Sequence, residues 1–93
     1  MKFMLTFTLK SETRDTAFAR FLKTGAQPSK GATLLGRWPR QDLAGGFVLL
    51  DSNDPKALSA FARDWSDVCD LALHPVVEDA ELAEVLQAGG KKK

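Results

Sequence analysis

The chain has few of the residues on which most catalytic and metal sites depend. Its 93 residues include one cysteine, Cys69, and one histidine, His74. One cysteine excludes an internal disulfide framework and is too few for a zinc cluster, so we expect a reducing compartment. Cys-x-x-Cys, Gly-x-Gly-x-x-Gly, Walker and Ser-His-Asp patterns are missing. The motifs therefore predict no metal and no cofactor.

Long apolar runs are also missing. No stretch reaches the roughly 18 apolar residues that a membrane-spanning helix needs, and no basic-then-apolar signal opens the sequence. We therefore expect a cytoplasmic protein with no membrane partner.

The length and composition indicate one small domain. With 44% apolar residues, the chain suffices for a single but thin core, which burial against a second copy would help. We predict one domain over residues 1–88 and a flexible basic tail over residues 89–93.

Charge is balanced overall but not along the chain. Residues 1–50 carry eight Lys/Arg and three Asp/Glu, a net +5, whereas residues 51–93 carry five and nine, a net −4. Solvated faces with a basic tail account for this split, and charge complementarity between subunits remains an alternative.

Hydrophobic periodicity predicts the elements in the first half. Residues 2–9 alternate as a strand does, with one face formed by Phe3, Leu5, Phe7 and Leu9 and the other by Met4, Thr6 and Thr8. Ser11 is the expected N-cap of a helix that ends at Gly25. The apolar stripe of that helix consists of Ala17, Phe18, Phe21 and Leu22. Strands are expected over residues 32–38 and 46–52, joined by an open hairpin loop.

The second half repeats the helix and strand. Asp54-Pro55 predicts a helix start, because aspartate is a good N-cap and proline fits the first helical turn. The stripe of this helix consists of Leu58, Phe61, Ala62 and Trp65. Residues 69–77 predict the last strand, and Glu78-Asp79 the start of a short terminal helix carrying Leu82, Val85 and Leu86.

This order predicts an α+β, ferredoxin-like βαββαβ fold. Right-handed connections place both helices on one face of a four-stranded antiparallel sheet and leave the other face open. In the second strand, alternation predicts one face with Leu34, Gly36 and Trp38 and the other with Leu35 and Arg37. In the last strand, it predicts one face with Leu71, Leu73 and Pro75 and the other with Ala72, His74 and Val76. An open face with such residues exposes an apolar patch, so we expect a second copy to cover it.

Five residues are candidates for a ligand site on this sheet: Thr6, Thr8, Arg37, Trp38 and His74. His74 suits a general acid or base or a ligand to haem or a metal, although an ordinary strand-end histidine explains it as well. Arg37 beside Trp38 suits an anionic or planar ligand, and an interface pair is the alternative. Cys69, next to Asp70 and near Asp67, is expected to have no lowered pKa and is not a nucleophile candidate.

Nucleic-acid binding is not expected. The RNA-recognition module, which shares this topology, needs several aromatic residues in its third strand. The sequence there is Gly45-Gly46-Phe47-Val48-Leu49-Leu50, with one aromatic residue, and the domain is not basic.

A recognisable set of segments comprises residues 1–8, Leu34-Leu35-Gly36-Arg37-Trp38, Gly46-Phe47, Asp54-Pro55-Lys56-Ala57-Leu58 and Trp65. Through these segments, nearly the whole chain resembles a small bacterial family catalogued as a domain of unknown function (3303). The resemblance implies a dimeric α/β barrel, in which two sheets face each other around a shared cavity. Proteins of that broad superfamily include small monooxygenases and haem-degrading enzymes, but no family-specific catalytic set is present here.

Two functions remain open from the sequence. The first is a homodimeric barrel that binds a small hydrophobic or planar molecule, with or without catalysis, between its sheet faces. The second is a non-catalytic interaction or structural module that dimerises through the open face.

Overall fold

The computed structural model describes residues 1–91. In chain order, the elements are β1 (Lys2–Leu9), η1 (Ser11–Thr13), α1 (Arg14–Thr24), β2 (Ala32–Pro39), β3 (Gly45–Ser52), α2 (Pro55–Trp65), β4 (Cys69–Val76) and α3 (Asp79–Lys91). The expected βαββαβ order and the terminal helix are confirmed, with strand boundaries within one residue of the predicted ones.

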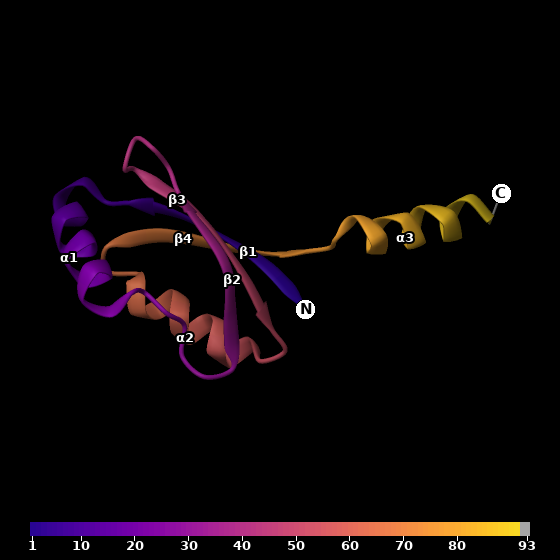
Figure 1. The fold of residues 1–93 in the computed structure, drawn as a ribbon, viewed down its shortest axis with the longest axis horizontal. Helices are drawn as coiled ribbons and strands as arrows, with labels where there is room; N and C mark the ends of the chain where they lie inside the picture. The colour runs from indigo at the N-terminus through magenta and orange to yellow at the C-terminus, as the bar shows by residue number, and fades with distance from the viewer. Residues whose placement is uncertain (92–93) are drawn as a thin grey trace.

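The four strands form one antiparallel sheet in the order β2-β3-β1-β4. Helices α1 and α2 lie on the same side of this sheet and leave the opposite side uncovered (Figure 1). The architecture is therefore the predicted α+β ferredoxin-like arrangement.

Strand register assigns the alternating side chains to the two faces. On the helix-covered face, Phe3 pairs with Leu50 and Leu5 with Val48 across β1 and β3. These residues form the main core with two side chains of α2, Leu58 and Phe61. A smaller cluster beside it consists of Ala17, Val68 and Cys69.

A β-bulge interrupts β2 and changes the expected faces of this strand. Leu34 pairs with Leu50, but the next paired residue is Gly36, opposite Leu49. The extra residue moves Gly36 to the open face and Arg37 to the helix-covered face. The predicted grouping of Leu34 with Gly36 and Trp38 is therefore wrong, because it assumed an uninterrupted alternation.

Helix α1 differs from the prediction in two details. Ser11 begins η1 and does not cap α1, whose N-cap residue is Thr13, without a side-chain cap bond. Leu22 was expected in the apolar stripe but points to solvent and is 82% exposed. The face that α1 buries, centred on Ala17, is narrower than the predicted stripe. The expected end is confirmed, since Gly25 has a left-handed φ of 72° and its N–H donates to the Phe21 carbonyl over 2.8 Å.

Helix α2 begins and packs as its sequence predicts. The Asp54 carboxylate accepts a hydrogen bond from the N–H of Lys56 over 3.0 Å, and Pro55 occupies the first turn. Leu58 and Phe61 are buried against the sheet. These two contacts fix α2 closely to the covered face.

Helix α3 projects away from the rest of the chain (Figure 1). Its apolar side chains, Leu82, Val85 and Leu86, are all exposed. An ion pair between Lys2 and Glu78, 2.6 Å long, holds the segment just before it. The helix continues to Lys91, residues 92 and 93 of the expected tail lie outside the described residues, and the flexibility of residues 89–93 stays a prediction. No helix in residues 1–91 has the length and apolar character to cross a membrane.

Candidate functional site

The open face carries four of the five candidate residues. Thr6, Thr8, Trp38 and His74 all have the strand parity of this face. One row of paired residues crosses the whole sheet, from Trp38 through Phe47 and Thr6 to Ala72. His74 lies in the neighbouring row, paired with Met4 on β1.

An aromatic pair dominates the β2 side of the open face. Trp38 and Phe47 are register partners and are 55% and 45% exposed. Phe47 is not among the five candidate residues predicted from the sequence. The alternation in β3 could have indicated its position, because Val48 and Leu50 are buried on the covered face and Phe47 therefore falls on the open face.

Gly36 allows the Trp38 indole to lie across β2. A Cβ atom built on Gly36 would lie 2.4 Å from Cη2 of Trp38, which is far inside van der Waals contact. The indole therefore lies against the glycine backbone and leaves a flat apolar surface exposed to solvent. This packing gives the Gly36-Arg37-Trp38 block a local structural reason.

Trp38 and His74 do not form one site within a single chain. They come from β2 and β4, the two edge strands, with β3 and β1 between them. Three interstrand spacings of about 4.8 Å separate the two backbones by roughly 14 Å. The open face therefore has an aromatic side at β2 and a mixed side at β4, where the imidazole lies.

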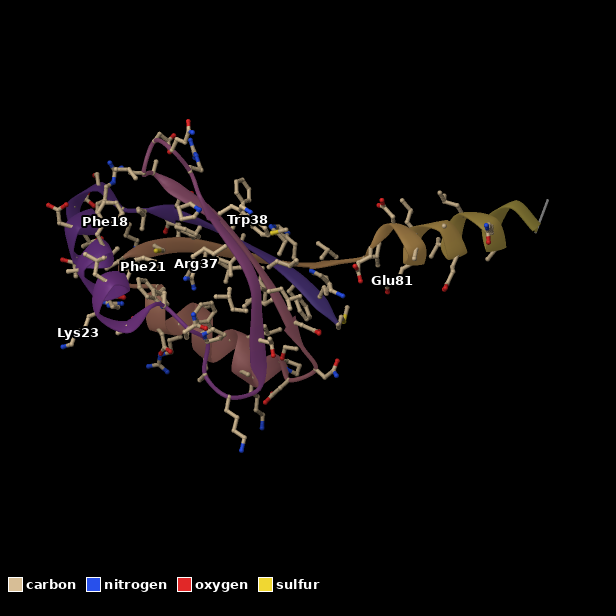
Figure 2. The ribbon with its side chains drawn as sticks, in the orientation of Figure 1. Phe18, Phe21, Lys23, Arg37, Trp38 and Glu81 are labelled. Carbon is tan, nitrogen blue, oxygen red and sulfur yellow. The ribbon has the colours of Figure 1, made fainter. Side chains whose placement is uncertain are left out.

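Arg37, the fifth candidate, lies on the opposite face. Its guanidinium donates to the carbonyl oxygen of Gly25 over 3.1 Å and to that of Ala26, just beyond the C-terminus of α1. It also lies over the Phe21 ring, with Cζ 5.4 Å from the centroid (Figure 2). Burial lowers the pKa of the Arg37 guanidinium from its usual value. Arg37 and His74 thus do not point into one cavity of the single chain.

A cavity of about 250 Å³ lies between α1 and the covered face of the sheet. All four strands, both covering helices and the β2–β3 loop contribute to its walls. Apolar atoms form almost all of the wall surface. Arg37 also lines the cavity, with its guanidinium beside Phe21 and Ala26, two further lining residues. The cavity exists because α1 buries one side chain fully, that of Ala17, and so fills less space over the sheet than α2 does.

The polar groups near this cavity offer little reactive chemistry. Cys69 is buried, and burial followed by the nearby Asp67 charge raises the pKa of its thiol. The expectation that this pKa is not lowered is confirmed. In residues 1–91, no group of three or more His, Cys, Asp or Glu side chains is arranged to hold a metal ion.

Comparison with curated proteins gives no match to this chain. The sequence profile of one family covers nearly all of it, from residue 1 to residue 90. The chain therefore belongs to the family described as a domain of unknown function, DUF3303.

Proposed function

We propose that this protein is a cytoplasmic homodimer whose two open sheet faces enclose a binding site for a small hydrophobic or planar molecule. The observation that carries the proposal is the exposed aromatic pair, Trp38 and Phe47, on a sheet face that no helix covers. Such a surface is costly in water and favours association with another apolar surface.

The terminal helix supports self-association independently. Helix α3 projects from the chain with Leu82, Val85 and Leu86 exposed, and it has no core of its own. A helix of this length is marginal in water without tertiary packing. A second copy that covers the open face supplies a surface for α3 as well.

The arrangement of the open face favours a planar or apolar ligand between the two sheets. The flat indole of Trp38 and the Phe47 ring suit stacking, while Thr6 and Thr8 supply hydroxyl groups one strand away. In a twofold dimer whose axis runs along the strands, the β4 side of one sheet lies over the β2 side of the other. This packing brings an imidazole toward an aromatic pair.

A dimer without a ligand is the second candidate, and one observation favours it. Arg37, the expected anion anchor, points to the helix-covered face, so the open face lacks the guanidinium that the ligand hypothesis included. A face of flat aromatic and aliphatic side chains also suits protein–protein packing.

The two candidates separate in a direct experiment. Sedimentation velocity and amide NMR spectra, recorded over a wide concentration range, are expected to show a dimer with concentration-dependent shifts at open-face residues such as Thr6 and Ala72. Native mass spectrometry of the purified dimer then looks for a bound small molecule. A monomer at all concentrations contradicts both candidates. A dimer that carries no added mass and takes up no planar probe, such as an anilinonaphthalene dye, supports the second candidate alone.

A further inference from the structure

The cavity between α1 and the sheet lies on the face opposite the proposed dimer surface. We propose that the cavity beneath α1 binds a small apolar carboxylate, whose anionic group pairs with the Arg37 guanidinium while the cavity walls cover its hydrocarbon part. This site is separate from the open face, and the inference does not depend on dimerisation.

The first support is the incomplete pairing of the Arg37 charge. Its terminal nitrogens donate to two backbone carbonyl groups, and no Asp or Glu of residues 1–91 lies within ion-pair distance. Carbonyl dipoles satisfy hydrogen bonds without neutralising a positive charge. A guanidinium also has further N–H groups, which have no partner in the described part of the chain. A carboxylate can accept from two of these groups at once.

The surroundings of Arg37 strengthen such a pair. The guanidinium is partly withdrawn from water, and one side of it contacts the Phe21 ring. Opposite charges attract more strongly where water is excluded, since the local dielectric constant is lower. The cavity walls around it contain no second charged side chain. An anion is therefore the charged group that this cavity favours.

The volume sets the size of the ligand. The cavity of about 250 Å³ compares with about 30 Å³ for one water molecule in the liquid. It therefore accommodates about eight to ten non-hydrogen atoms. A straight-chain acid such as octanoate, or a benzene ring with a short acidic side chain, has this size.

The rim offers an entrance. Phe21 on α1 and Leu43 in the β2–β3 loop both line the cavity and are 41% and 55% exposed. Leu43 has a φ of 62°, a left-handed conformation that costs a residue other than glycine roughly 1–2 kcal/mol. Leucine at a position that favours glycine or asparagine keeps an apolar side chain at this rim.

The test uses octanoate and octanol as matched probes with the unmodified full chain. Titrations followed by methyl NMR spectra are expected to give saturable shifts at Val48 and Leu71, which line the cavity, and not at Ala72 on the open face. Octanoate is expected to bind about 10- to 100-fold more tightly than octanol, as a charge-assisted hydrogen bond implies.

Two variants assign that preference to Arg37. Arg37→Gln is expected to reduce octanoate affinity by the same factor and to leave octanol binding unchanged. The matched control is Arg63→Gln, which removes an equal charge from the exposed surface of α2 and is expected to change neither affinity.

Three results overturn the inference: no saturable octanoate shifts at millimolar concentration, equal affinities for octanoate and octanol, or shifts confined to the open face. The comparison of the two probes needs no variant, so it decides the question even if Arg37→Gln does not fold. Failure of dimerisation leaves the expected shifts unchanged, and the two proposals therefore fail separately.

Discussion

Replacement of Trp38 by alanine tests the proposed dimer at its strongest point. The indole is 55% exposed in the single chain and rests on the Gly36 backbone, away from the core. The substitution therefore removes interface surface at little expected cost to the fold. We expect it to weaken dimerisation strongly and to change the free energy of unfolding of the monomer by less than about 1 kcal/mol.

The size of the effect follows from the exposed area. A tryptophan side chain has about 250 Å² of surface at most, so an exposure of 55% leaves about 140 Å² for the interface. At about 25 cal/mol per Å², burial of this area is worth up to about 3.5 kcal/mol per subunit. A twofold interface contains the residue twice, so the dimer loses about 4–6 kcal/mol. The dissociation constant then rises by a factor of about 10³–10⁴.

Sedimentation equilibrium over a range from micromolar to millimolar protein measures this change. Leu22→Ala is the matched control, since Leu22 is 82% exposed on α1 and lies on the other side of the molecule. Gly36→Ala is the geometric variant, because its Cβ would meet the indole at 2.4 Å and force it off the strand. We expect the dimer dissociation constant of Leu22→Ala to equal that of the parent. That of Gly36→Ala is expected to lie between the values for the parent and for Trp38→Ala.

Two results would refute this reasoning. One is a change of less than tenfold in the dissociation constant of Trp38→Ala, which would place the interface elsewhere. The other is an equal loss in Leu22→Ala, which would show that general surface hydrophobicity drives association and that the open face has no special part in it.

Three further predictions concern stability. Asp54→Ala removes the α2 cap and is expected to lower the free energy of unfolding in urea by about 1 kcal/mol, whereas Asp54→Asn keeps most of it; equal losses would contradict the capping role. The hydrogen bonds from Arg20 lower the pKa of Asp67 below its ordinary value. The pair therefore stabilises the fold fully above the ordinary carboxyl pKa, and this stabilisation is lost as the pH falls through the lowered pKa. Asp67→Asn should remove this acid step from a plot of urea midpoint against pH, and an unchanged plot would argue against it. Leu50→Ala, at a fully buried site, should lower the free energy of unfolding of the monomer by about 2–5 kcal/mol. Leu86→Ala, at an exposed site on α3, should lower it by less than about 0.5 kcal/mol, and thermal unfolding measures both changes.

The order of elements was predictable because its signals are local. The alternation in residues 2–9 and the Asp54-Pro55 pair depend on neighbours within a few positions, and the structure has a strand and a helix start there. The extent of the α1 stripe was not predictable in the same way. Leu22 matches the helical period as well as Phe18 does, but only packing against the sheet decides which side chain is buried.

The candidate site was only partly predictable, since it depends on how the strands pair. Thr6 and His74 lie in uninterrupted strands, so parity alone puts each on the face opposite its apolar neighbours. Arg37 follows a bulge, which reverses the face of every later residue in β2. The available signal was Gly36, because an isolated glycine within a strand pattern often marks a bulge.

The chemistry of β3 explains why β2 needs this bulge. Uninterrupted pairing after Leu34 would put Trp38 on the covered face opposite Gly46, where the Phe7 ring and the backbone of β2 already lie within 2.8 Å of a built Cβ. An indole has no room there. The same pairing would place the Arg37 charge opposite Phe47, in the middle of the apolar open face and away from the carbonyl groups beyond α1. One extra residue at Leu35 resolves both conflicts. Two adjacent side chains then lie on opposite faces of the sheet, the cation beside the carbonyl groups beyond α1 and the aromatic ring on the surface proposed for dimerisation.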